Sequence, residues 1–185
     1  FMRAKTVNQI KKAYCFDFDD TLVKTDAKVY VYKQGKMIKS LTPEQFNHYV
    51  KAPDEEIDIS EFKDPRLILS ARKYKMWPAL QNMNNAIRQG RSSSEIFILT
   101  ARSAIAQNPI YNFLKANDIF IPEDHIITIG DDIGEISIPE EKKKVLKQLR
   151  SQFDELTFFD DNPKNIELAR EVGGIRTRLV DSVNI

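Results

Sequence analysis

Short apolar runs, each followed by a polar residue, constrain the fold of this chain more than any other feature of its sequence. Four of them are AYCF before Asp17, EIFIL before Thr100, HIITI before Gly130 and LTFF before Asp160. Runs of this length and composition predict buried β-strands. A fifth segment, GIRTRLV near the C-terminus, alternates more strongly and predicts a strand at the edge of a sheet.

Helical patterns separate these strands, with apolar residues three and four positions apart and proline in the first turn. They run from Pro78 to Gly90, from Pro109 to about Ala116, from Pro139 to about Gln152 and from Asn162 to Gly173. Strands that alternate with helices form right-handed crossovers and a mostly parallel sheet. The sequence therefore predicts a Rossmann-like α/β domain of three layers, in which ligands bind at the carboxyl ends of the strands.

Residues 24–64 interrupt this alternation. Two runs, 27–33 and 36–41, flank the turn dipeptide QG and predict a β-hairpin, which a short helical piece and the acidic segment DEEIDISE follow. We interpret this stretch as a small cap or flap inserted after the first strand, within a single domain over residues 2–185. Residues 24–51 contain six Lys and two acidic residues. This basic stretch is either a solvated face or a flap over the substrate.

Composition excludes several classes of protein. The 185 residues, 42% of them hydrophobic, suffice for one ordinary core, and a formal net charge of +1 gives no field that would attract nucleic acid or anionic membranes. A single Cys excludes an intrachain disulfide framework and a Cys-rich zinc module. Without a signal peptide or an apolar run of about 18 residues, we expect a cytoplasmic protein without membrane association.

Three aspartates fall within four positions of FDFDDTL, residues 16–22, directly after the first predicted strand. Two carboxylates about 4 Å apart repel by roughly 1 kcal/mol in water and by about 4 kcal/mol at an effective dielectric of 20. A turn or helix cap explains one Asp, but three indicate a cation, and oxygen ligands without His or Cys nearby favour Mg²⁺. In strand geometry Asp17 and Asp19 point to the same side, so one could attack a substrate while the other transfers a proton.

A second acidic pair, Asp160 and Asp161 in FFDDNPKN, follows the fourth predicted strand. Such residues often cap a helix, but Asn162 already fills that position. The pair therefore suggests metal ligation.

The loop after Thr100 is a candidate anion site, because a hydroxyl and backbone N–H groups meet there at a strand end. Two residues later, Arg102 either reaches a substrate phosphate or is an ordinary exposed residue at a helix start. Asp131 and Asp132, in the segment IGDDIGE, indicate a solvated loop.

Three consecutive lysines, Lys142, Lys143 and Lys144, follow Pro139. Only Lys142 precedes the apolar residues of this helix by three, four and seven positions, which places it on the buried face one turn nearer the helix start. That face points to the carboxyl edge of the sheet. We expect Lys142 to enter the site and the other two to lie in solvent.

Together these motifs resemble the haloacid dehalogenase (HAD) superfamily phosphatases of the DxDxT type. FDFDDTL resembles their first motif, LTAR the second, the helix lysine the third and FFDDNPKN the acidic fourth, in the same order along the chain. The resemblance implies that Asp17 is the nucleophile that forms an aspartyl-phosphate and that Asp19 is the general acid and base. It also implies that Asp17, the Asp19 backbone carbonyl, Asp160 and Asp161 hold Mg²⁺.

The same resemblance implies that Thr100, the following Ala101 and Lys142 bind the phosphoryl oxygens. The expected activity is hydrolysis of a phosphomonoester; the alternatives are a phosphotransferase and a non-catalytic phosphate-binding module of the same fold. The substrate is a small molecule, such as a nucleotide, or a nucleic-acid end, such as a polynucleotide 3′-phosphate. The sequence leaves the oligomeric state open.

Overall fold

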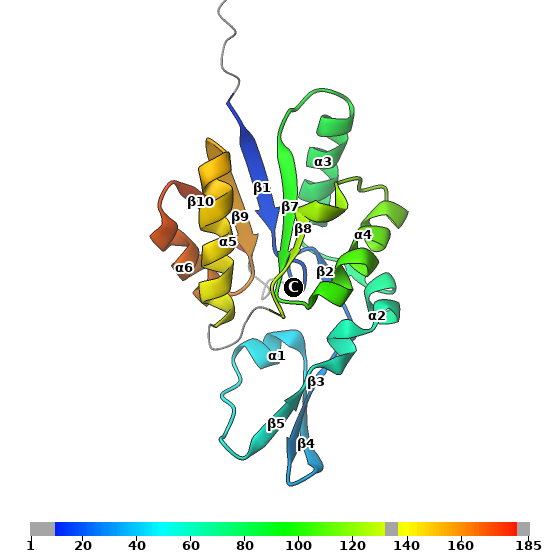
Figure 1. The fold of residues 1–185 in the computed structure, drawn as a ribbon. Helices are drawn as coiled ribbons and strands as arrows, with labels where there is room; N and C mark the ends of the chain where they lie inside the picture. Colours follow the sequence, from blue (N-terminus) through cyan, green and yellow to red (C-terminus); the bar gives the residue numbers. More distant parts are fainter. Residues whose placement is uncertain (1–9, 132–136, 181–185) are drawn as a thin grey trace, which may run out of the picture.

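A computed structural model describes residues 10–131 and 137–180 of the chain (Figure 1). Asp132 and the predicted domain ends, 2–9 and 181–185, lie outside these ranges. The central sheet has the order β10-β9-β1-β7-β8, and every neighbouring pair of strands is parallel. Its strands are β1 (Lys12–Phe16), β7 (Glu95–Thr100), β8 (Ile126–Thr128), β9 (Glu155–Asp160) and β10 (Ile175–Leu179). The mostly parallel sheet and the edge position of the last strand are as predicted.

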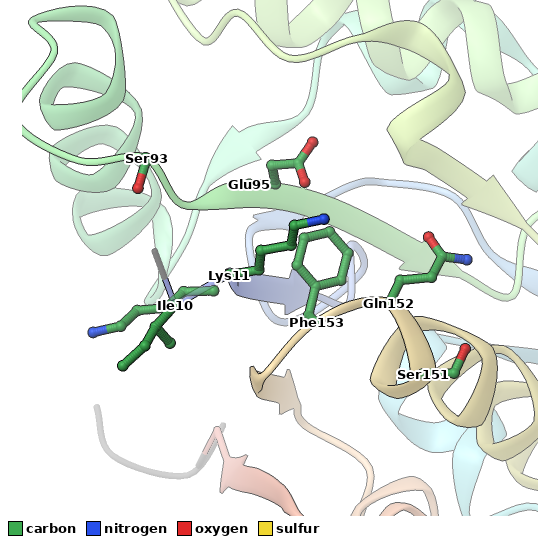
Figure 2. A pocket seen from close by; sticks show the side chains of 8 residues that line it. Ile10, Lys11, Ser93, Glu95, Ser151, Gln152 and Phe153 are labelled. Atoms are coloured by element: carbon green, nitrogen blue, oxygen red, sulfur yellow. The ribbon is translucent and has the colours of Figure 1, made fainter. Parts of the chain in front are cut away.

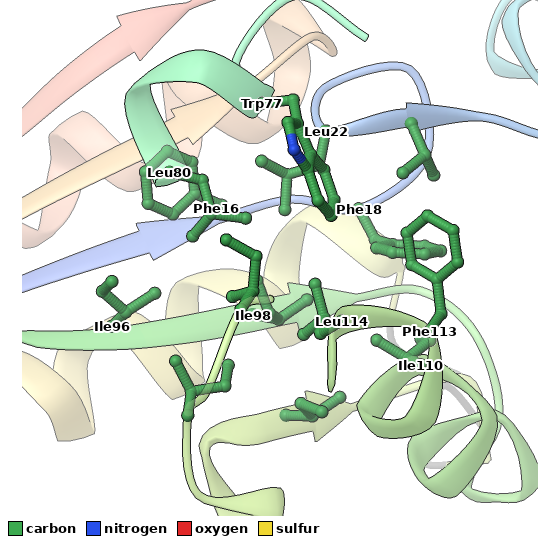
Figure 3. Packing of buried hydrophobic residues seen from close by; sticks show 14 of the residues in the cluster. Phe16, Phe18, Leu22, Trp77, Leu80, Ile96, Ile98, Ile110, Phe113 and Leu114 are labelled. Carbon is green, nitrogen blue, oxygen red and sulfur yellow. The ribbon is translucent and has the colours of Figure 1, made fainter. Parts of the chain in front are cut away.

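Helices cover both faces of the sheet. They are α3 (Trp77–Arg88) and α4 (Gln107–Ala116) on one face, and α5 (Ile138–Gln152) and α6 (Pro163–Val172) on the other (Figure 1). A hydrophobic core lies on each face of the sheet, and alternate residues of a strand point into opposite cores. Phe16 and Ile98 pack with α3 and α4, as Figure 3 shows, whereas Cys15 and Leu99 pack with α5 and α6. This arrangement confirms the predicted three layers.

Three of the four predicted helix starts agree with the structure to within one residue. Asn162 caps α6 through a 2.9 Å bond from the Lys164 N–H to its Oδ1, as expected. Helix α4, however, begins at Gln107 and not at Pro109. The prediction was wrong because proline fits anywhere in a first turn, where backbone N–H groups have no partner within the helix.

The insertion leaves the sheet at β2 (Val23–Lys24) and returns at β6 (Arg72–Lys73), and these two strands pair antiparallel. Between them lie β3 (Val29–Lys33), β4 (Lys36–Leu41), α1 (Pro43–Asn47), β5 (Glu55–Asp58), the 3₁₀ turn η1 (Ser60–Lys63) and α2 (Pro65–Leu69). We call β3, β4, β5 and α1 the cap, which lies beyond the carboxyl ends of the sheet strands (Figure 1). Two further 3₁₀ turns are η2 (Ala104–Ala106) and η3 (Glu123–His125).

The predicted hairpin is confirmed: β3 and β4 pair antiparallel around Gln34 and Gly35, whose φ angles of 50° and 74° suit a two-residue hairpin turn. The acidic segment after α1 forms β5, which pairs with the other side of β3. Acidic side chains therefore stand beside the basic hairpin. No helix in the part of the chain described here is long and apolar enough to cross a membrane.

Candidate active site

The candidate site lies where the strand order reverses. The chain passes from β1 to β7 and β8 on one side, then returns to β9 and β10 on the other. Asp17 directly follows central β1, Thr100 ends β7 and Asp160 ends β9. Parallel strands present their carboxyl ends at the same edge, so residues far apart in sequence meet at this switch point.

Lys142 joins two of the predicted acids. Its Nζ donates to Asp17 Oδ1 at 2.8 Å and to Asp160 Oδ2 at 2.7 Å, and only 2% of its side chain is exposed. Burial alone would lower the Lys142 pKa, but the charges of Asp160 and Asp17 outweigh it and raise the pKa above its usual value. Lys143 pairs with Glu171 at the surface instead. The structure thus brings only the first of the three lysines into the site.

The Asp160 carboxylate is fixed by neighbours on its own loop and helix. Its Oδ1 accepts the backbone N–H of Asn162 at 2.8 Å, and its Oδ2 accepts Asn165 Nδ2 at 3.0 Å. The side chain is fully buried. Its orientation is therefore set by the start of α6 as well as by Lys142.

Three carboxylates cluster at this point. Asp17, Asp160 and Asp161 each offer one oxygen, and these atoms lie within 4.8 Å of one another. Burial, followed by the nearby Asp160 charge, raises the pKa of Asp17 to about 7. Burial and then Asp17 raise the pKa of Asp161 to about 10. One buried ammonium does not neutralise three carboxylates, and the donors are all oxygen, so the cluster fits a hard divalent cation such as Mg²⁺.

Asp19 stands apart from this cluster. Its carboxylate accepts two hydrogen bonds from Arg102, with Nε to Oδ2 at 2.9 Å and Nη2 to Oδ1 at 2.7 Å. Strand geometry was assumed through Asp19, but that assumption was wrong, because β1 ends at Phe16 and the chain turns so that Asp20 has a φ of 62°. Asp17 and Asp19 therefore contact different partners.

The Thr100 loop is supported by the residues after β8. The buried Thr100 hydroxyl accepts the Arg102 N–H at 3.2 Å, and the half-buried Ala101 lies between them. Gly130 donates its N–H to the Arg102 carbonyl at 2.9 Å. Asp131, expected in a solvated loop, is exposed but accepts the Ala104 N–H at 2.7 Å through Oδ2.

The sequence left the role of Arg102 open, and it did not single out Thr21. Arg102 is 3% exposed, so the reading of it as an exposed residue at a helix start is wrong. Thr21 places its hydroxyl 3.1 Å from Asp17 Oδ2 and 3.4 Å from Asp161 Oδ1. The sequence signal for Arg102 is its place two residues after a strand end, next to the strand that presents the acids. The signal for Thr21 is its place within FDFDDTL.

A cavity of about 420 Å³ lies next to the cap. Its lining includes Asp20 and Thr25 from the chain leaving the sheet and Glu44 from α1. Asp20 is 6% exposed, and its Oδ2 has no hydrogen-bond partner among the described residues. Burial and the neighbouring Asp19 raise the Asp20 pKa to about 6. Asp20 adjoins the predicted acid, Asp19, in the sequence, although Asp19 itself does not line this cavity.

A second cavity, of about 680 Å³, lies at the opposite edge of the sheet (Figure 2). Lys12 and Glu95, at the amino ends of β1 and β7, line it together with Phe153. None of the predicted site residues lines either cavity, but the smaller one is lined by Asp20, their neighbour in sequence. Cavity size alone therefore does not identify the candidate site.

A parallel sheet with helices on both faces, an acidic cluster at its strand ends and a small cap after the first strand define a Rossmann-like α/β fold. The chain is similar to the HAD domain of the effector protein Lem4 from Legionella pneumophila, in a structure of an inactive mutant. The TM-score is 0.51 at 11% sequence identity, over 96% of this chain and 89% of that one. A structure of the Lem4 HAD domain not described as a mutant gives a TM-score of 0.47 at 14% identity, over 96% and 90%. No protein-family model and no curated protein matches the sequence.

Proposed function

We propose that this protein is a Mg²⁺-dependent phosphomonoester hydrolase that acts through an aspartyl-phosphate on Asp17. The observation that carries the proposal is the buried Lys142 ammonium, which pairs with both Asp17 and Asp160. These two carboxylates form a cluster with that of Asp161. Phosphoryl transfer depends chiefly on positioning and on neutralising charge. The site supplies both at the end of the central strand.

In the proposed first step, a carboxylate oxygen of Asp17 attacks phosphorus and the bond from phosphorus to the ester oxygen breaks. Asp19 donates a proton to the leaving oxygen. Water then attacks the phosphorus of the aspartyl-phosphate and gives a proton to Asp19. The bond from phosphorus to the Asp17 oxygen breaks, inorganic phosphate leaves and the Asp17 carboxylate is restored. Mg²⁺ held by Asp17, the Asp19 carbonyl, Asp160 and Asp161 would offset the negative charge that keeps a carboxylate from approaching a phosphate.

The phosphoryl oxygens would be held by the Thr100 hydroxyl, the Ala101 backbone N–H and the Lys142 ammonium. The leaving group would extend toward the cavity that Asp20 and Thr25 line. We propose a phosphorylated substrate with a polar leaving group, either a small molecule such as a nucleotide or a nucleic-acid end.

Turnover of p-nitrophenyl phosphate by the full chain tests this function. We expect Mg²⁺-dependent activity that EDTA removes and that Asp17→Asn lowers by at least about 1000-fold, because no nucleophile remains. The matched control is Asp124→Asn, an exposed carboxylate in η3. Full activity in Asp17→Asn would contradict the proposal, and analysis of products with added alcohols would detect transfer to an acceptor other than water.

A further inference from the structure

Arg102 contacts both connections between the sheet and the cap, as well as Asp19. Its Nη1 donates to the Phe62 carbonyl at 2.7 Å, and its guanidinium lies 4.9 Å from the centre of the Phe62 ring. Its Nη2 lies 3.4 Å from the Thr25 hydroxyl. Thr25 is on the segment that leaves the sheet, and Phe62 is on the segment that returns from the cap. One buried side chain therefore links the two ends of the cap to the predicted acid.

The geometry of this contact fixes the plane of the Asp19 carboxylate. A guanidinium donates two parallel hydrogen bonds in a rigid fork, which a lysine ammonium cannot reproduce. Arg102 is itself held, because its N–H bonds the Thr100 hydroxyl and its carbonyl accepts the Gly130 N–H. A carboxylate has about four acceptor positions, so Asp19 keeps lone pairs for a leaving group or a water molecule after accepting two bonds.

We propose that Arg102 is a positioning residue that orients Asp19 for proton transfer and makes this orientation depend on the placement of the cap. The inference rests on the proposed function, in which Asp19 protonates the leaving oxygen. Arg102 acts through Asp19 and through the cap connections, without contact to the transferred phosphoryl group. Substrates whose leaving group needs a proton therefore depend on Arg102 more than substrates whose leaving group is a stable anion.

Arg102→Lys tests this dependence, because it keeps the charge and loses the fork. The readout is kcat/KM for p-nitrophenyl phosphate, which releases a stable anion, and for an alkyl phosphate, which needs protonation as it leaves. Since kcat/KM includes only the steps up to release of the alcohol, later hydrolysis of the aspartyl-phosphate does not mask the effect. We expect the alkyl phosphate to lose at least about tenfold more than p-nitrophenyl phosphate.

The matched control is Arg66→Lys. Arg66 forms the same kind of two-bond pair with Asp64, at 3.1 and 2.9 Å, but it is exposed and makes no contact with the site residues. This variant should leave kcat/KM for both substrates unchanged. Phe62→Leu provides a second test if Arg102→Lys does not fold: it removes the ring against the guanidinium, keeps the backbone carbonyl, and should shift selectivity in the same direction by a smaller factor.

Equal losses for the two substrates in Arg102→Lys and in Phe62→Leu would overturn the inference and leave the proposed function intact. Unchanged kcat/KM values in both variants would overturn it as well. Absence of turnover by the unmodified protein with Mg²⁺ would overturn the proposed function and the inference together. The experiment therefore separates failure of the positioning role from failure of the enzyme assignment.

Discussion

The protonation of single carboxylates in the site is coupled to folding. A carboxyl group whose pKa is higher in the folded chain than in the unfolded chain binds more protons when folded, so the free energy of unfolding falls as pH rises between the two values. For Asp17 this interval runs from 3.8 to about 7, and for Asp161 it extends to about 10. Without divalent cations, the folded state should lose stability continuously from pH 5 to pH 8.

Thermal unfolding in EDTA measures this effect. We expect Tm to fall by about 8 °C or more over that range. A carboxyl group that stays protonated only in the folded chain costs about 1.4 kcal/mol per pH unit, and 1 kcal/mol changes Tm by about 2–4 °C in a chain of this size. Mg²⁺ should raise Tm more at pH 8 than at pH 5, since it binds ionised carboxylates. Asp161→Asn should flatten the profile and Asp124→Asn should not. A flat profile in the unmodified chain, with no response to Mg²⁺, would contradict a shared cation site.

Gly130 is a single residue on which the Thr100 loop depends. A Cβ at this position would lie 2.6 Å from the Ala101 carbonyl oxygen and 2.7 Å from backbone atoms of Arg102 and Ser103. We predict that Gly130→Ala costs about 1–3 kcal/mol of stability by overpacking and lowers kcat/KM at least tenfold, because the loop that carries Thr100 must move.

Gly35→Ala is the control for that substitution. Gly35 has a φ of 74° and open space around its Cα, so alanine there strains the hairpin turn without touching the site. It should cost about 1 kcal/mol of unfolding free energy and leave kcat/KM unchanged. Urea unfolding and steady-state kinetics on both variants separate the two effects, and equal kinetic losses would show that general destabilisation accounts for both.

Helix α6 has the element boundary with the clearest sequence signals, and it follows directly after Asp160 and Asp161 of the acidic cluster. Asn162 Oδ1 caps the helix, while its own N–H donates to Asp160. We predict that Asn162→Ala lowers the free energy of unfolding by about 1 kcal/mol and that Asn162→Ser restores most of it, because serine also caps helices. Urea unfolding measures both. Alanine without cost would show that the Asn162 side chain does not stabilise the start of α6.

Local signals explain which elements were predictable. The strands that end at Phe16, Thr100 and Asp160 are buried on both faces, which requires continuous apolar runs, and these are visible in the sequence. Strand β5 escaped recognition because its residues, EEID, are mostly acidic and pair with β3 at the edge of a small sheet. Such a strand depends on its neighbour and not on its own pattern.

The site was predictable at the level of the whole molecule only in part. Parallel topology indicates that the strand ends meet, and helix periodicity separates Lys142 from Lys143 and Lys144. The fork between Arg102 and Asp19 was not predictable, because it depends on a turn after β1 and on the path of the chain back from the cap. Contacts across long sequence separations, such as that between Arg102 and Phe62, leave no periodic pattern.

Charge in the cap also needs the whole structure to interpret. The stretch 24–51 alone looks basic, but over residues 24–64 seven Lys stand against eight Asp and Glu. Strand β5 brings acids beside the hairpin, and Lys33 pairs with Asp54 at 3.1 Å. A cap with balanced charge makes few contacts with a phosphate backbone, so a bound nucleic acid would be held mainly at its terminal phosphate.

Salt dependence measures the number of such contacts. For a single strand, each neutralised phosphate contributes about −0.7 to the slope of log affinity against log salt concentration. We predict a slope no steeper than about −1.5 for kcat/KM with a 3′-phosphorylated oligonucleotide, if that substrate is cleaved. Glu56→Lys, at the exposed residue of β5, should steepen the slope by about 0.7. Glu167→Lys on α6 makes the same change in net charge away from the cap and should leave the slope unchanged. A slope near −3 in the unmodified chain would mean that the lysines of the cap contact several phosphates of the oligonucleotide despite their acidic neighbours.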